Sequence, residues 1–335
     1  MKKSLLALAV LGAFAGVASA QSSVTIFGVV DLSINQIKNG TAKTTSMQSN
    51  QLNSNRLGFR GVEDLGGGMS AGFWLEAPMS NQDGNPGALN FTRRSTVSLF
   101  SGAGEIRLGR DYDPSFWNTV YFDVNGANGI GEGLNLITAL GSGASTIARA
   151  NNSIGYFLPS NLGGVYGQAM AALGQGVDAN KYYGGRIGYA AGPIDVAFGY
   201  GVTKVTPAND FKMMNIGASW NFGAAKLYGY WNQNKFGALK QDVYEISVGV
   251  PLGQGEFRAS YGHENASGGT TNPNDANLWS LGYVYNLSKR TALYGGYAEI
   301  SNKGAAAFTI LGGTAQAGLA GHKSSGFNVG MRHSF

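Results

Sequence analysis

Apolar and polar residues alternate along most of this chain with a period of two. In the segment 24–31, one face carries Val24, Ile26 and Val30. The opposite face carries Thr25 and Asp31. The same pattern recurs at 242–250, 278–287 and 327–335. A period of two with one apolar face is typical of half-buried β-strands, so the chain is predicted to be all-β.

Such segments recur from end to end, and about sixteen strands are predicted. They lie near 24–35, 51–63, 68–78, 91–101, 104–111, 150–159, 163–173, 181–191, 193–203, 211–222, 224–235, 241–251, 255–265, 276–287, 291–301 and 324–335. Tight turns alternate with longer connections at 36–50, 79–90, 112–148, 174–180, 204–210, 236–240, 266–275 and 302–323. Short turns at one end and long ones at the other indicate an up-and-down antiparallel meander, and an even strand number places both chain ends at the short-turn end.

Composition favours a sheet closed in a membrane. Charged residues are only 13% of the chain, about half the ~25% of ordinary globular domains. The mean hydropathy is −0.08, as expected where lipid-facing and lumen-facing residues alternate. Closure removes the exposed edges that a membrane does not tolerate. The fold class is therefore predicted as a transmembrane antiparallel β-barrel of 16 strands. A secreted β-sandwich or soluble barrel would also alternate, but it needs a compact apolar core, and the second face here is rich in Gly, Ser, Thr, Asn and charge.

The first twenty residues read as a removable export address. Lys2 and Lys3 precede an apolar stretch over 5–17, and the small residues Ala18-Ser19-Ala20 form a cleavage site. Residues 1–20 are predicted to be a cleaved signal peptide. Residues 21–335 show no linker or composition shift, so they are predicted to form one barrel domain. The chain has no cysteine, so an exported chain of this size must rely on strand pairing and burial rather than on disulfides.

One connection, Tyr112–Ala148, is much longer than the others. A connection of this length is normally disordered or functional. It contains Asp113, Asp123 and Glu132, many apolar residues, and neither Lys nor Arg. Arginines crowd the segments around it, at positions 93, 94, 107, 110 and 149. An acidic segment with enough apolar surface to fold therefore lies beside a basic wall.

Several segments together resemble the Gram-negative general-diffusion porins, most closely the β-proteobacterial type. They are "SVTIFGVVDLS" at the start of the mature chain, "NRLGFRGVEDLGGGMSAGFWLE" at 55–76, "FTRRSTVSLFSGAGEIRLGRDYDP" at 91–114, "RANNSIGYFLP" at 149–159 and the closing "VGMRHSF". The resemblance implies a sixteen-stranded barrel in the outer membrane of a Gram-negative bacterium, usually a homotrimer. It also implies that the third long loop, Tyr112–Ala148, folds into the lumen and narrows it.

In this family, acidic groups of the loop face basic groups of the wall across the constriction. The residues carried over to the basic wall are Arg56, Arg60, Arg93, Arg94 and Arg149. Parity supports the first two, because Leu57 and Phe59 take the lipid face. Parity favours Arg94 over Arg93 for the lumen, and a β-bulge would let both reach it.

The resemblance assigns the acidic side of the constriction to Asp113, Asp123 and Glu132. Asp113 precedes Pro114 and is equally well interpreted as a turn-former. The terminal Phe335 resembles the signal read by the barrel-assembly machinery, and it also fits an aromatic belt at the lipid interface.

The function that follows is passive diffusion of small hydrophilic solutes and ions through a water-filled pore. The candidate inward arginines outnumber the loop carboxylates, which favours anions. The alternatives are a substrate-specific channel, or a barrel that acts as an adhesin or receptor through its outer loops. The three histidines are scattered and no Gly-x-Ser-x-Gly motif occurs, so neither an enzyme nor a cofactor is expected. The expected partners are other copies of the chain, outer-membrane lipid and lipopolysaccharide, the assembly machinery and the solutes. The formal charge of +5 falls by two with Lys2 and Lys3, so nucleic acid is not an expected partner.

Overall fold

The computed structural model describes residues 23–84, 89–176, 181–269, 274–311 and 319–335. The predicted signal peptide, residues 1–20, lies outside these ranges. Neither of the two described helices, α2 (Trp117–Tyr121) and η1 (Gly133–Leu136), is long and apolar enough to cross a membrane.

Seventeen strand segments make one continuous sheet. They are β1 (Ser23–Asn39), β2 (Ala42–Ser49), β3 (Arg56–Gly66), β4 (Met69–Pro78), β5 (Arg94–Ser101), β6 (Gly104–Tyr112), β7 (Arg149–Phe157), β8 (Val165–Ala172), β9 (Tyr182–Ala191), β10 (Ile194–Lys204), β11 (Asp210–Asn221), β12 (Lys226–Phe236), β13 (Leu239–Leu252), β14 (Gly255–Ser267), β15 (Ala276–Asn286), β16 (Thr291–Asn302) and β17 (Lys323–Ser334).

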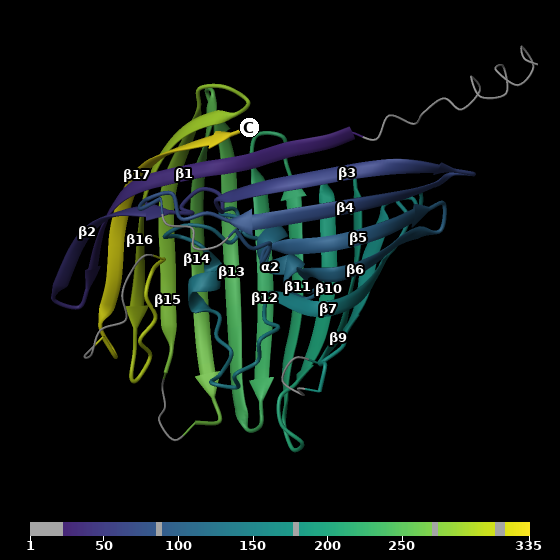
Figure 1. Ribbon diagram of the computed structural model, residues 1–335. Helices are drawn as coiled ribbons and strands as arrows, with labels where there is room; N and C mark the ends of the chain where they lie inside the picture. The colour runs from purple at the N-terminus through teal and green to yellow at the C-terminus, as the bar shows by residue number, and fades with distance from the viewer. Residues whose placement is uncertain (1–22, 85–88, 177–180, 270–273, 312–318) are drawn as a thin grey trace, which may run out of the picture.

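The sheet closes into a barrel (Figure 1). From β3 to β17 each strand pairs antiparallel with the next. The last strand then pairs with the first, from Val29↔Ser334 to Asn39↔Ser324. Because β2 and β3 both pair with β1, at different heights, they share one position in the ring. The predicted closed barrel of sixteen antiparallel strands is confirmed.

The first hairpin differs from the expected one. β1 continues to Asn39 and β2 starts at Ala42, so the prediction of a long connection over 36–50 is wrong. The inward and outward alternation of side chains continues through this part of β1: Ile37 is buried inside the ring, and Lys38 is exposed outside. The chain reverses at Gly40, whose φ of +57° is a left-handed conformation that glycine adopts without strain.

The predicted strand 51–63 begins only at Arg56, because the residues before it turn inward. The Asp31 carboxylate accepts hydrogen bonds from the backbone N–H groups of Leu52 and Asn53, both at 2.6 Å. The Asn55 side chain accepts a bond from the Asp31 N–H, also at 2.6 Å. A buried carboxylate thus holds the segment 50–55 against β1 and sets where Arg56 enters the wall.

The two faces of the sheet differ as the alternation requires. Large apolar side chains such as Ile216 and Ile246 are exposed on the outside of the ring. Their neighbours along the strands, Asn215 and Ser247, are buried on the inside. An apolar outer face and a polar inner face are what a lipid-embedded barrel with a wet lumen needs.

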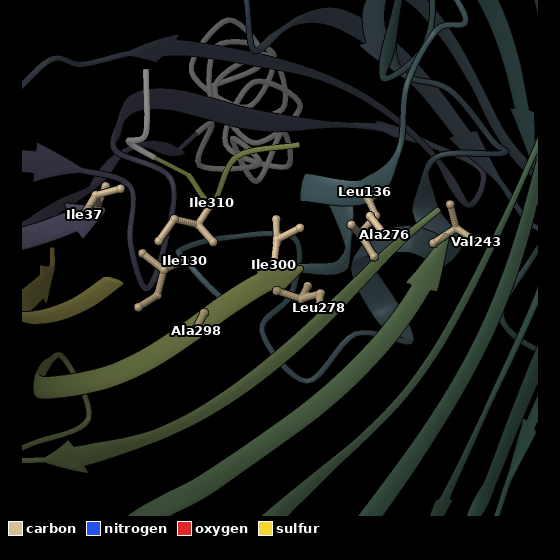
Figure 2. Packing of buried hydrophobic residues seen from close by; sticks show 9 residues of the cluster. All are labelled: Ile37, Ile130, Leu136, Val243, Ala276, Leu278, Ala298, Ile300 and Ile310. Carbon is tan, nitrogen blue, oxygen red and sulfur yellow. The ribbon is translucent and has the colours of Figure 1, made fainter. Parts of the chain in front are cut away.

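A buried apolar cluster lies inside the ring (Figure 2). Leu136 of η1 and Ile130 pack there against wall residues such as Leu278 and Ile300. Complete burial of a leucine or isoleucine side chain contributes about 1.5–3 kcal/mol. This cluster therefore fixes part of the segment between β6 and β7 to the strands β13–β16.

Candidate functional site

The first half of the long segment between β6 and β7, residues 113–148, is tied to β11 and β12. The side-chain amide of Asn118 in α2 donates to Asn215 Oδ1 at 2.9 Å. Asn215 Nδ2 donates in turn to the backbone carbonyl of Ser115 at 2.7 Å. The hydroxyls of Thr119 and Tyr230 are 2.7 Å apart. These bonds join buried groups, so α2 is held inside the ring (Figure 1).

The second half of the segment is held by β13. The backbone N–H of Thr138 donates to Gln241 Oε1 at 2.9 Å. Gln241 Nε2 donates to the Leu136 carbonyl at 3.1 Å. Gln241 is only 1% exposed and Leu136 is fully buried. One glutamine thus satisfies two backbone groups of the segment, which follows the inner wall as a loop.

A cluster of arginines gathers around a single glutamate on another part of the wall. Glu76 Oε1 accepts from Arg93 Nε at 2.6 Å and lies 3.4 Å from Arg56 Nη1. The other carboxylate oxygen accepts from the indole N–H of Trp74 at 3.1 Å. One negative charge therefore orients two guanidinium groups, and a positive charge remains on the pair.

Arg149 completes this cluster through a backbone bond and an aromatic face. Its Nε donates to the Arg93 carbonyl at 2.8 Å. Its guanidinium carbon lies 4.0 Å from the centre of the Tyr112 ring. That ring stacks on Phe116 at 5.3 Å, so the aromatic residues at the start of the loop support the arginine. We call Arg56, Arg93 and Arg149 the arginine triad.

The triad borders an open cavity of about 730 Å³ between the loop and the wall. Among the described residues, six cationic side chains line it: Arg56, Arg93, Arg149, Lys226, Arg258 and Arg332. Two carboxyl side chains, Asp123 and Glu256, also line it. The cavity is therefore strongly electropositive, which attracts anions.

Two of the arginines carried over from the resemblance lie elsewhere. Arg60 and Arg94 are not among the described residues that line the cavity. Arg94 Nε donates to Thr96 Oγ1 at 3.0 Å and lies 4.0 Å from Asp111. The Glu76 carbonyl accepts a hydrogen bond from the Arg93 N–H at 3.1 Å, and Glu76 is the register partner of Arg94. Both arginine side chains lie on the inner face, because Arg93 bonds the Glu76 carboxylate and the Arg94 guanidinium carbon lies 4.6 Å from the centre of the Trp74 ring.

Of the three loop carboxyl groups carried over from the resemblance, Asp123 lines the same cavity as the triad, whereas Asp113 and Glu132 are not among its described lining residues. Asp123 accepts bonds from the backbone N–H groups of Asn125 at 2.7 Å and Gly133 at 3.1 Å, so it shapes the loop. It also hydrogen-bonds the Glu245 side chain of β13. Burial, and then the neighbouring Asp123, raise the pKa of Glu132 well above its usual range. These carboxyl groups point to β13 because the loop lies there, and the wall itself supplies the partner of the triad through Glu76.

Asp113 lies where the chain leaves β6. It is fully buried, and neither carboxylate oxygen has a hydrogen-bond partner among the described residues. Burial raises the pKa of Asp113 well above its usual range, against the opposing charges of Arg110 and Arg149. Its N–H donates to the Ala148 carbonyl at 3.0 Å, which closes the base of the loop.

Three cationic residues of the cavity were missed by the sequence analysis: Lys226, Arg258 and Arg332. Each follows the parity of its strand; Phe257 and Met331, for example, are exposed outside, so Arg258 and Arg332 point inward. That parity was available from the sequence. The resemblance drew attention to the first half of the chain instead.

The terminal Phe335 lies at the closure of the barrel. Its backbone exchanges two hydrogen bonds with Gly28, at 3.0 and 3.1 Å. A Cβ on Gly28 would lie 2.3 Å from the Phe335 ring, so only glycine leaves room for it. The ring is 45% exposed, as expected at a lipid interface, and its role as an assembly signal stays a prediction.

Replacing Glu76 by Gln is expected to increase the positive charge that the triad presents to the cavity. The side chain keeps its size and an acceptor for Arg93, but the counter-charge is lost. Because the excess charge at a constriction sets selectivity, we expect the anion-to-cation permeability ratio to rise roughly twofold to fivefold. Reversal potentials in a salt gradient measure it. Glu63→Gln, an exposed carboxylate of β3, is the matched control and should leave the ratio unchanged.

The fold and the cavity together define a class of protein. A closed barrel with an apolar outer face, an open electropositive interior and an inward-folded loop is a membrane channel. Within the described ranges, no group of three or more His, Cys, Asp or Glu side chains could hold a metal ion.

Comparison with known proteins identifies the family. Residues 7–305 match the model of the Gram-negative porins, and the chain belongs to this family. The chain is 40% identical over the full length of both sequences to outer membrane porin protein 32 of Delftia acidovorans. Its structure superposes on an anion-selective porin from Comamonas acidovorans with a TM-score of 0.86 and 36% identity, covering 94% of this chain and all of the other. The trimer form of OmpT of Vibrio cholerae shares the fold, with a TM-score of 0.70 over 94% of this chain and 99% of that one at 14% identity.

The resemblance to porins is confirmed by these matches. The protein is an outer-membrane diffusion channel of a Gram-negative bacterium. Its relatives are channels rather than enzymes.

Proposed function

We propose that this porin is a general-diffusion channel that prefers anions and passes small hydrophilic solutes. The observation that carries the proposal is the charge of the cavity, where six cationic side chains stand against two carboxyl groups. The Asp123 carboxylate accepts hydrogen bonds from backbone N–H groups of the loop. The Glu256 carboxylate forms an ion pair with Arg258 at 2.7 Å. Even with Glu76 counted, six cationic side chains stand against three carboxyl groups, so the cavity keeps a positive excess.

The triad is the proposed selectivity element. Its guanidinium groups are held by Glu76, by the Arg93 carbonyl and by the Tyr112 ring, so they need little reorganisation when an anion arrives. The loop side of the same cavity carries aromatic rings, backbone groups and the single carboxyl group of Asp123 rather than the row of carboxylates expected at first. An anion thus meets fixed positive charge in a narrow wet passage, and a cation is repelled. The anion selectivity of the Comamonas acidovorans porin supports the same reading.

The other expectations belong to this proposal. Residues 21–335 form one barrel domain after removal of residues 1–20, and three copies assemble, as in the trimer form of OmpT. Phe335 is read by the barrel-assembly machinery, and lipopolysaccharide surrounds the outer half of the barrel. The channel needs no cofactor, does not bind nucleic acid and is not an enzyme, because passive diffusion involves no chemical step.

Planar-bilayer recordings of the purified protein test the proposal. In a tenfold gradient of KCl we expect a reversal potential of the sign that chloride selectivity requires, with a current linear in concentration. Since surface charges are screened within ~8–10 Å at physiological salt, the preference should weaken as the salt rises. A cation-selective reversal potential would contradict the anion preference. A KCl current that saturates as the salt concentration rises would favour the substrate-specific alternative.

A further inference from the structure

Arg60 and Arg94, the two arginines outside the cavity, belong to a second inward-facing cluster. It is a stack of aromatic rings and guanidinium groups on β1, β3, β4 and β5, which lie side by side in Figure 1. The guanidinium carbon of Arg60 lies 5.4 Å from the centre of the Phe27 ring and 5.1 Å from that of Trp74. The guanidinium carbon of Arg94 lies 4.6 Å from the Trp74 ring.

The stack faces the lumen. On β3, Arg60 has the parity of Arg56, which lines the cavity. On β4, Trp74 has the parity of Glu76, to which its indole N–H donates. The adjacent residues of the opposite parity, such as Phe73, are exposed on the lipid face.

The rings are held in place before any solute arrives. A Cβ on Gly58 would lie 2.2 Å from the Phe27 ring, so the glycine leaves the space that this ring fills. The rings of Phe27 and Trp74 meet edge to face at 5.0 Å and 63°. The bond from Trp74 to Glu76 fixes the second ring. Arg60 is therefore positioned by packing rather than by a counter-charge.

Arg60 differs from its neighbours in what surrounds its charge. Arg56 and Arg93 share Glu76, and Arg94 has Asp111 at 4.0 Å. Among the described residues, no carboxylate lies within 4.0 Å of the Arg60 guanidinium, and this side chain is exposed. Its guanidinium group packs against the Phe27 and Trp74 rings, and the exposure of the side chain leaves N–H groups open to the lumen. A guanidinium edge is a fork that matches two coplanar oxygens.

The place of Arg60 makes it a separate site. It lies four residues beyond Arg56 on β3, about 13 Å towards the short-turn end at ~3.3 Å per residue. Short turns face the periplasm in barrels of this kind. A separation of about 13 Å exceeds the screening length of ~8–10 Å at physiological salt, so the triad and Arg60 act as successive sites.

We propose that Arg60, packed against the rings of Phe27 and Trp74, is a second anion-binding station on the periplasmic side of the cavity, and that it favours small carboxylates over halides. The inference rests on the proposed anion channel and adds a solute class to it. A carboxylate leaving the triad accepts two N–H bonds from Arg60 through two coplanar oxygens, whereas chloride is a single spherical acceptor that cannot match the fork. Fast conduction needs several weak binding sites in sequence rather than one tight site. Arg60 is the site that follows the triad along the pore.

Competition between acetate and chloride in planar bilayers tests the station. With the full-length protein in KCl, we expect potassium acetate to reduce the chloride current saturably. Arg60→Gln, which removes the charge, and Arg60→Lys, which keeps the charge but removes the fork, should both weaken acetate inhibition about threefold to tenfold. Phe27→Leu should weaken it in the same direction without any change of charge. Arg290→Lys, in the exposed β15–β16 turn, is the control and should match the unmodified protein.

Arg60→Lys with unaltered inhibition would show that charge alone acts and would overturn the preference for carboxylates. Arg60→Gln with unaltered inhibition, or an unmodified channel that acetate does not inhibit, would overturn the station itself. The reversal potential in KCl alone is read separately: it should stay anion-selective in all three variants, because the triad is untouched. A cation-selective reversal potential of the unmodified protein would instead contradict the proposed function.

Discussion

Replacing Arg56 and Arg149 together by alanine is expected to shift the channel strongly towards cations and to raise its conductance. Two of the three guanidinium groups of the triad disappear, while Arg93 keeps its bond to Glu76. A unit charge about 4 Å from a passing ion is worth ~1 kcal/mol in water. Two such charges correspond to about 2 kcal/mol before screening. We therefore expect the anion-to-cation permeability ratio to fall about tenfold.

The measurement is the reversal potential in a KCl gradient, with single-channel conductance recorded on the same membranes. The conductance should rise because two large side chains leave the cavity. The matched control is Lys289→Ala with Arg290→Ala, which removes two positive charges from the exposed β15–β16 turn. If the control shifts selectivity as much as the triad variant, net charge rather than the site is responsible. Unchanged selectivity and conductance in the triad variant would exclude Arg56 and Arg149 from the site.

The strands were predictable because their information is local. A period of two survives in each segment whatever the rest of the chain does, so the number of ring positions and the antiparallel order follow from the sequence. The exception at β1 and β2 has the same cause. Gly40 and its polar neighbours resemble a loop, but tertiary pairing of Asn39 with Ala42 and with Ser324 keeps this hairpin in the sheet.

The site was predictable only in part, because it depends on where a loop comes to lie. The wall arginines sit on strands, and parity or resemblance pointed to Arg56 and Arg149, which line the cavity in the structure. The direction of a loop carboxylate depends on contacts between residues far apart in the chain. Asp123 binds the N–H of Gly133 and meets Glu245, more than a hundred residues away. No local pattern announces that contact.

The buried carboxyl groups of the loop make its attachment to the barrel wall depend on pH. Burial and the neighbouring Asp123 raise the pKa of Glu132, so the closed loop holds a proton that the free carboxyl would release. Below the ordinary value near 4.5, Glu132 is protonated in both states and its ionisation does not oppose closure. As the pH rises from there towards the raised pKa, only the detached loop ionises, and attachment is lost. For one proton the slope is ~1.4 kcal/mol per pH unit, which is about a tenfold increase in the open fraction.

Hydrogen exchange of the loop amides, corrected for the intrinsic effect of pH, measures this opening. We expect the corrected exchange rates of the amides between Asn125 and Thr138 to be higher at pH 8 than at pH 5, because the loop opens more often. Glu132→Gln cannot ionise, so it should reduce the slope and slow exchange at pH 8. The remaining slope would belong to Asp123, the neighbouring carboxyl group of the loop. Glu63→Gln, an exposed carboxylate of β3, is the control and should keep the full slope. A Glu132→Gln protein with the unmodified slope would show that Glu132 carries none of the pH dependence, and the loop would then be held by Gln241 and the Leu136 cluster regardless of pH.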